Sequence, residues 1–247
     1  MKRWFLFVWL LLPLPIVVWH YGPGQKWLAR DQAHTLIQRA HTAETQKNWR
    51  EAETLFREAS DRIGNTDSRL KTQLDIALVR ARYRQGGAVE AIDGIDGLIN
   101  EPRFHRQPAE LQREARELAG RIHYHAAWVM RLEGAQKELW MEEAELARQN
   151  FRLLSEETLS AGRTNYSQLQ QTNLESAVRL ERMGLVDLMA RPLPEEGEAM
   201  SGHGLSEQMA RRRGQRGKGR RPGIGENDEG PPASGAGNQR FPGGPGS

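Results

Sequence analysis

The stretch "NWREAETLFREASDRIGN", residues 48–65, decides the fold because its apolar side chains repeat with a helical period. Trp49, Ala52, Phe56 and Ala59 lie at offsets 0, 3, 7 and 10, so they form one stripe along a helix. The two alanines allow another helix to approach closely, and the Phe56 ring fills the space between helices. The stretch therefore predicts a helix that packs between neighbouring helices.

The same period continues from residue 33 to residue 190, where almost nothing resembles a strand. This pattern predicts an all-α fold of about seven helices, within a domain that spans residues 31–190. The expected helices cover residues 36–43, 52–63, 70–81, 91–99, 111–130, 139–154 and 169–183. Short connections between them imply antiparallel neighbours, and therefore either a bundle or a solenoid.

Internal repetition favours the solenoid. The segment "EAETLFREA" resembles the second helix of the tetratricopeptide repeat, a helix–turn–helix unit of 34 residues with an A-x3-F pattern. Three successive units place repeat residues at Ala52, Phe56 and Ala59, at Ala91, Ile95 and Leu98, and at Ala147, Phe151 and Leu154. The steps from one unit to the next are 39 and 56 residues, so the array is irregular. The alternative is an ordinary helical bundle in which this pattern is accidental.

The resemblance to the tetratricopeptide-repeat superfamily implies a protein-interaction scaffold rather than a catalyst. In outline the chain is also similar to small bacterial inner-membrane helical-repeat proteins that accompany MoxR-type ATPases and von Willebrand A-domain proteins. Architecture alone carries this second likeness, and the identity of a protein partner stays open. The candidate partner-binding residues lie on the first helices of the units: Gln38, Gln46, Lys71, Arg82 and Gln112.

Residues 1–24 are predicted to form a signal anchor. Lys2 and Arg3 precede an uncharged apolar run, so residues 4–21 are expected to lie in a lipid bilayer. The basic residues favour a cytoplasmic N-terminus at a bacterial inner membrane, with the bulk of the chain periplasmic. The alternatives are a cleaved signal peptide, which lacks a good small-x-small cleavage site here, and a buried soluble helix.

The sequence contains no pattern typical of an enzyme. The absence of cysteine excludes disulfides and thiolate chemistry. His123 and His125 lie on nearly opposite sides of a helix, so they cannot share one metal ion, and each histidine is expected at the surface or partly buried. Carboxylates such as Asp96 and Glu143 lie among basic residues at helical spacing, which favours solvated surfaces. We therefore expect no catalytic residues, no cofactor and no metal.

Residues 191–247 are rich in Gly and Pro and are predicted to be a disordered tail. The overall charge of +3 arises at the two ends of the chain, because 22 Lys and Arg face 25 Asp and Glu between residues 31 and 190. The alternative function is binding of nucleic acid or an anionic surface through a basic cluster in this tail. The cluster comprises Arg211, Arg212, Arg213, Arg216, Lys218, Arg220 and Arg221. An exported tail would not meet nucleic acid, and Leu205–Arg213 could form a short helix on binding.

Overall fold

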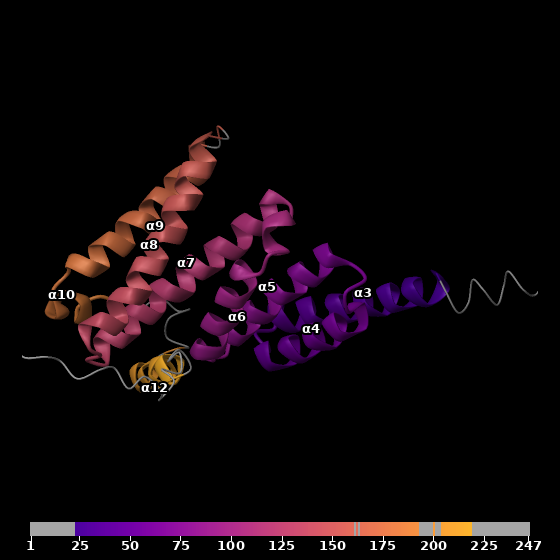
Figure 1. Ribbon diagram of the computed structural model, residues 1–247, viewed down its shortest axis with the longest axis horizontal. Coiled ribbons are helices and arrows are strands. Elements are labelled where there is room, and N and C mark those ends of the chain that lie inside the picture. Colours follow the sequence, from indigo (N-terminus) through magenta and orange to yellow (C-terminus); the bar gives the residue numbers. More distant parts are fainter. Residues whose placement is uncertain (1–22, 161, 163, 193–199, 201–203, 219–247) are drawn as a thin grey trace, which may run out of the picture.

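The computed structural model describes residues 23–160, 162, 164–192, 200 and 204–218. Over these residues the regular structure is entirely helical, which confirms the predicted all-α fold. Figure 1 shows an elongated arrangement, with α3 at one end and the pair α8–α9 at the other. The seven helices expected from the sequence correspond to α3 through α9.

The helices have the following bounds. The first four are α3 (Pro23–Thr45), α4 (Trp49–Ile63), α5 (Ser68–Arg84) and α6 (Ala88–Asn100). A 3-10 turn η1 (Phe104–Arg106) leads to α7 (Ala109–Leu132), α8 (Lys137–Ser160) and α9 (Thr164–Arg182). The short α10 (Leu185–Met189) and the separate α12 (Leu205–Lys218) follow.

Local sequence explains why the chain turns back after each helix. The Asn48 side chain accepts a hydrogen bond from the Glu51 N–H at the start of α4, and Asp67 does the same for the Leu70 N–H in α5. Gly64 follows α4 with a φ of 53°, a conformation that glycine adopts without steric cost. These signals produce short connections, so consecutive helices lie side by side.

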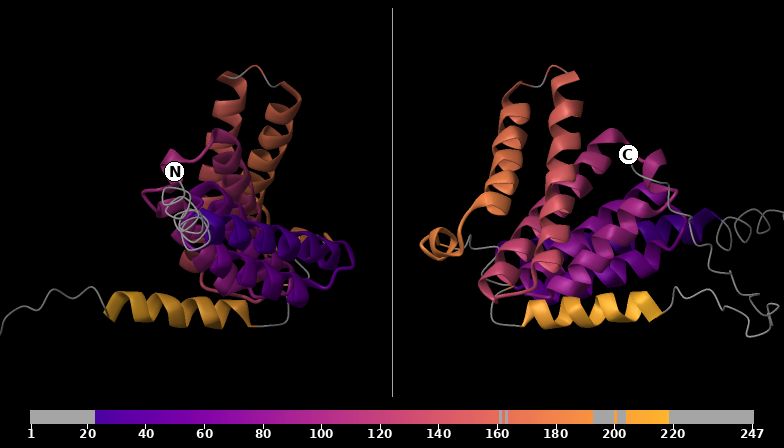
Figure 2. Two further views of the ribbon diagram at one scale, coloured as in Figure 1. Left: turned by 90° about the vertical axis from the view of Figure 1, so that its right-hand side faces the viewer. Right: turned by 60° about the vertical axis from the view of Figure 1, so that its left-hand side comes forward.

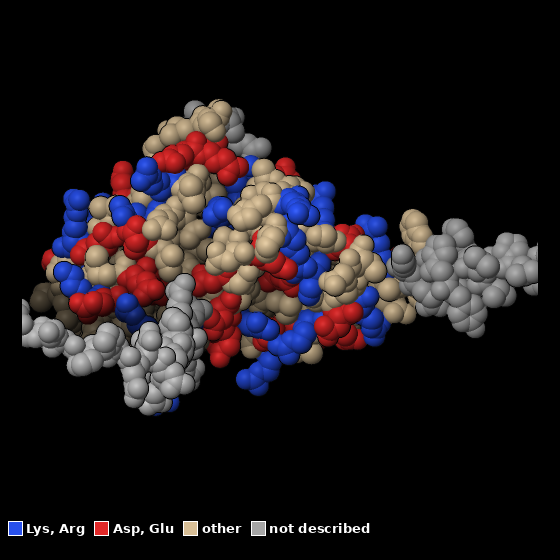
Figure 3. All heavy atoms as spheres, viewed as in Figure 1, with Lys and Arg blue, Asp and Glu red and all other residues tan. Residues whose placement is uncertain are grey.

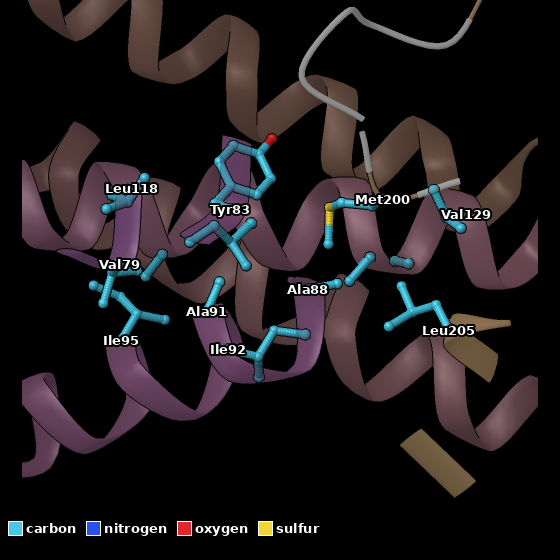
Figure 4. Packing of buried hydrophobic residues seen from close by; sticks show 14 of the residues in the cluster. Val79, Tyr83, Ala88, Ala91, Ile92, Ile95, Leu118, Val129, Met200 and Leu205 are labelled. Atoms are coloured by element: carbon cyan, nitrogen blue, oxygen red, sulfur yellow. The ribbon is translucent and has the colours of Figure 1, made fainter. Parts of the chain in front are cut away.

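All nine proposed repeat residues are buried. Each helix from α3 to α9 packs against the next one along the chain, and α5 also contacts α7. The first three repeat residues belong to an apolar cluster of α3, α4 and α5, and the second three to the large central cluster. The third three lie in a smaller cluster with Ala177 of α9. Figure 4 shows how Ala91, Ile92 and Ile95 of α6 face the rest of the central cluster. The architecture is therefore repeat-like, while membership of the tetratricopeptide-repeat superfamily stays a prediction.

Helices α7 and α8 pack closely at Gly120, which lies against the ring of the repeat residue Phe151. A Cβ atom added at Gly120 would lie 2.6 Å from Cε1 of Phe151. We expect Gly120→Ala to lower the free energy of unfolding by about 1–3 kcal/mol, because the clash outweighs the better helix propensity of alanine. Urea denaturation measures this change.

Gly97→Ala is the matched control, because Gly97 is also inside a helix and its added Cβ meets no atom within 4 Å. This substitution is expected to stabilise the protein by about 0.5–1 kcal/mol. If both substitutions stabilised the protein equally, the close packing of α7 on α8 would be wrong.

Two expectations about the ends of the chain need correction or lie outside the described residues. Pro23 and Gly24, assigned above to the anchor, instead begin α3. Among the described helices, none has both the length and the apolar character to cross a membrane. The predicted bilayer segment, residues 4–21, lies outside the described residues.

The prediction of a fully disordered tail is wrong for Leu205–Lys218, which forms α12. Its apolar residues Leu205 and Met209 are buried against the helical body, and its arginines pair with acidic side chains there. Composition suggested disorder because so few apolar residues are present, but docking onto a preformed surface needs only a few. The other parts of the tail, residues 193–199, 201–203 and 219–247, lie outside the described structure.

Candidate functional site

Helix α12 rests on an acidic groove of the helical body. Figure 2 shows α12 as a separate helix lying along one side of the body, and its contacts are with α6, α7 and α8. We define the acidic groove by residues of α6 and α8: Asp93, Asp96, Leu139, Glu142, Glu143 and Leu146. A small cavity of about 80 Å³ remains between this groove and α12.

One stripe of α12 makes the apolar contact with the body. Leu205 and Met209 are four residues apart, so they face the same side of the helix, and both are buried. Figure 4 shows Leu205 near Val129 of α7, with the buried Met200 close by. The apolar contact of α12 is thus limited to two of its own side chains.

Arginines continue the same side of α12 and meet the carboxylates of the groove. The Arg212 guanidinium forms an ion pair with Asp93 and lies 3.7 Å from Oδ2 of Asp96. Only 12% of the Arg212 side chain is exposed, so solvent screens these contacts less than usual. Arg213 lies 3.6 Å from Glu142, and both of these side chains are more than half exposed. Arg212 is therefore the stronger electrostatic contact.

Glu133, at the end of α7, holds the first turn of α12. Its carboxylate accepts hydrogen bonds from the N–H of Leu205 at 3.1 Å and from the N–H of Ser206 at 2.7 Å. The Ser206 hydroxyl donates a hydrogen bond to the same carboxylate. A carboxylate at this position satisfies free N–H groups and complements the positive end of the helix dipole. Polar contacts therefore fix α12 at both ends of its apolar stripe.

Below the groove, the buried His123 of α7 joins α6 to α8. Its Nδ1 lies 2.6 Å from Oε2 of Glu143, and its Nε2 lies 3.1 Å from Oδ1 of Asp96. Burial alone would lower the pKa of His123, but hydrogen bonds to the two carboxylates and their negative charges raise it to about 9. The ring is therefore an imidazolium at neutral pH and donates to both carboxylates. Through Asp96, this buried cation is linked to the surface that receives Arg212.

His125, two residues further along α7, has the opposite environment. It is buried beside Tyr83, whose hydroxyl is hydrogen-bonded to Nδ1 of the His125 ring. Burial lowers the pKa of His125, and the charges of Arg121 and Arg84 lower it further, to about 4. The two histidines thus face different partners, as their spacing predicts. The expectation that they lie at the surface or only partly buried is wrong.

The surface assignment of the carboxylates also needs correction. Glu143 is buried and Asp96 is partly buried, because both pair with His123. The two carboxylates bind opposite nitrogens of one ring, so they do not converge on a point where a metal ion would sit. Within the described residues, no group of three His, Asp or Glu side chains has an arrangement that could hold a metal ion.

The predicted partner-binding residues fall into two groups. Gln38 is exposed on α3, and Gln46 is exposed in the turn that follows it. The other three are partly buried and bonded within the chain: Lys71 Nζ lies 3.1 Å from Asp75, Arg82 Nε lies 2.9 Å from Glu53, and Gln112 donates to the Gln107 carbonyl at 2.8 Å. The structure therefore leaves Gln38 and Gln46 as the accessible candidates.

The basic cluster of the tail is divided as well. Arg211 pairs with Glu207 of its own helix, at 2.6 Å, while Arg212 and Arg213 pair with the acidic groove. The side chains of Arg216 and Lys218, together with residues Arg220 and Arg221, lie outside the described part of the structure. The three described arginines thus all lie beside carboxylates.

A larger, open hollow of about 920 Å³ lies along α9 and α10. Its apolar lining includes Leu174 and Val178, and its charged residues carry both signs. This mixture indicates no particular ligand, whereas α12 itself shows what the acidic groove accepts.

Comparison of the chain with protein-family models, with curated proteins and with solved structures finds no match. The assignment of a site therefore rests on the geometry alone. Sequence reasoning missed the acidic groove, although two signals for it were present. Acidic pairs occur on two expected helices, and an arginine run follows apolar residues at helical spacing in the tail.

Proposed function

We propose that the protein is a membrane-anchored helical-repeat scaffold that binds partner proteins in an envelope complex. The single observation that carries this proposal is the acidic groove, which receives a helix through two apolar side chains and two arginines. Docking of an amphipathic helix into a groove is a common mode of protein recognition. The body is therefore suited to hold another protein rather than to transform a small molecule.

The location of this scaffold follows from the N-terminal sequence. We propose that residues 4–21 anchor the chain in the inner membrane with the N-terminus in the cytoplasm, so that the helical body lies in the periplasm. Reporters active on only one side of the membrane, fused after residue 30 and after Ser247, test this topology. Exported signals from both fusions support the proposal, and cytoplasmic signals from both contradict it.

Binding of nucleic acid or an anionic surface through the basic cluster is the second candidate. Arg212 and Arg213 would first have to leave the carboxylates of the acidic groove. On the face shown in Figure 3, basic and acidic side chains are interspersed and form no continuous basic surface. These features favour the scaffold over the anionic-surface binder.

The scaffold is tested by photo-crosslinking in the membranes of the native host. A photoreactive residue at Gln38 on α3, at Gln46 in the turn after it, or at the exposed Glu138 beside the groove is expected to yield discrete adducts with a partner protein. Arg152, which is also exposed and lies on the part of α8 outside the groove, is the matched comparison. The absence of protein adducts from all of these positions, in a chain that is helical and membrane-bound, would contradict the scaffold.

A further inference from the structure

We propose that the acidic groove binds a cationic amphipathic helix of a partner protein, and that α12 is an intramolecular ligand which occupies the groove until that helix displaces it. This inference rests on the proposed scaffold function and names the partner chemistry of its site. The occupant is deduced from the contacts of α12 and from the charges of the groove.

The groove specifies the charge of its ligand. The groove holds four carboxylates, those of Asp93, Asp96, Glu142 and Glu143. The buried imidazolium of His123 pairs with two of them, Asp96 and Glu143. The groove therefore carries excess negative charge, and a ligand that supplies arginines relieves it. Glu133 adds a carboxylate where the first turn of a docked helix presents free N–H groups.

The stripe of α12 specifies the pattern of that ligand. Leu205 and Met209 are buried, Arg212 is nearly so, and these positions are spaced four and three residues apart on one helix face. A partner helix with two apolar residues at this spacing, followed by arginines, would make the same contacts. The pattern is short, so a short exposed helix of another protein would suffice.

The contact of α12 with the body is small compared with the contacts of the long central helix α7. It buries only two large apolar side chains of α12, whereas α7 alone buries Leu111, Leu118, Ile122, Val129 and Met130 among others. Elements with few buried apolar contacts and many polar ones open most readily. Helix α12 is thus well suited to leave its site.

Tethering explains how such a weak contact still occupies the groove. Helix α12 follows the body through residues 190–204, so it acts at an effective concentration on the order of 1 mM. A partner helix in solution must compete with α12 for the groove. Its apparent affinity is its intrinsic affinity multiplied by the fraction of grooves that α12 leaves free. A partner held at the membrane beside this protein would also have a high effective concentration near the groove.

The test uses the full chain and a fluorescent peptide with the sequence of residues 205–218 as the probe. The variant chain carries Arg212→Glu and Arg213→Glu, which release α12 and leave every residue of the acidic groove unchanged. Fluorescence anisotropy is expected to show that the probe binds this variant at least tenfold more tightly than it binds the wild-type chain. Binding is expected to weaken with salt, because it depends on ion pairs.

Two controls make the result specific. A probe with the residues corresponding to Arg212 and Arg213 replaced by glutamate should not bind the variant chain in which α12 is released. Adding Asp93→Arg and Glu142→Arg to the released chain should abolish binding of the basic probe, because the reversed groove matches the reversed α12. Should the charge variant fail to fold, Met209→Asp offers a second release variant that also leaves the groove intact.

Several results would overturn the inference. The first is that the probe does not bind the Arg212→Glu, Arg213→Glu variant although this variant is helical. The second is that the probe binds the wild-type chain and the variant equally. The third is that the groove substitutions leave binding of the probe unchanged. A wild-type dimer that disappears in the released chain would instead assign the groove to a second copy of this chain, and would also overturn it. A failure of the scaffold proposal is distinguished from these outcomes by the crosslinks from Gln38 and Gln46, which test that proposal at another surface.

Discussion

Replacing Glu143 with alanine is expected to lower the free energy of unfolding by about 3–5 kcal/mol, the usual cost of removing one partner from a buried ion pair. Glu143 is 5% exposed, and its carboxylate lies 2.6 Å from the buried His123 ring. Without Glu143, the imidazolium would keep Asp96 as its acidic partner and would lose the more deeply buried one. Urea denaturation of the full chain, followed by circular dichroism, measures the loss.

Glu142→Ala is the matched control, since it removes the same functional group from the adjacent position of α8. The Glu142 side chain is 58% exposed, and its partner Arg213 is 3.6 Å away and also exposed. Exposed pairs of this kind contribute less than about 1 kcal/mol. Similar small losses for both variants would show that His123 does not depend on a buried partner in α8.

The second large effect is a dependence of stability on pH with opposite slopes on either side of about pH 6.5. His123 has a pKa raised to about 9 and His125 has a pKa lowered to about 4, against 6.5 for an ordinary histidine. Each shift corresponds to roughly 3 kcal/mol between the protonated and neutral forms. Two residues that are separated by one position in the sequence thus act on stability in opposite directions.

The direction of each slope follows from proton binding by the folded and unfolded chains. Between pH 6.5 and 9 the folded chain keeps a proton on His123 that the unfolded chain has lost, so stability falls as pH rises. Between pH 4 and 6.5 the unfolded chain binds a proton at His125 that the folded chain excludes, so stability rises with pH. The contribution of this pair is therefore greatest near pH 6.5.

Denaturation of two variants across this range separates the two slopes. His123→Gln is expected to remove the fall in stability above pH 6.5 and to leave the rise below it. His125→Asn is expected to do the reverse, apart from the contribution of the carboxylates that titrate in acid. If the fall above pH 6.5 persisted in His123→Gln, the buried imidazolium would not be its cause.

The sequence predicted the helices and the burial of the proposed repeat residues well, because both depend on local periodicity. Ala52, Phe56 and Ala59 are buried as their spacing implies, and so are the corresponding residues of the two later units. A stripe of small and large apolar residues has one stable solution, which is burial against neighbouring helices. Gly120, by contrast, is a residue type that is unfavourable inside a helix. Its presence there is explained only by the ring of Phe151, which fills the space that a Cβ atom would need.

The acidic groove could not be predicted in the same way, because its contacts join distant parts of the chain. His123 pairs with Asp96 and Glu143, which are 27 and 20 residues away, and Arg212 pairs with Asp93. Charged residues at helical spacing are usually solvated, and nothing local distinguishes Glu143 from the exposed Glu142. Helix α12 was missed for a related reason: it is held by a surface that the rest of the chain must build first.

The most direct test of the central claim measures whether α12 occupies the acidic groove in the intact protein. The chain contains no cysteine, so Glu138→Cys and Gly214→Cys provide unique sites for spin labels on α8 and α12. Both positions are exposed, and a side chain at Gly214 meets no atom within 4 Å of its Cβ. Electron spin resonance should give one short, narrow distance distribution, which becomes long and broad when Arg212→Glu and Arg213→Glu are added. A broad distribution in the otherwise unmodified chain, or a narrow one that these two substitutions leave unchanged, would contradict the account.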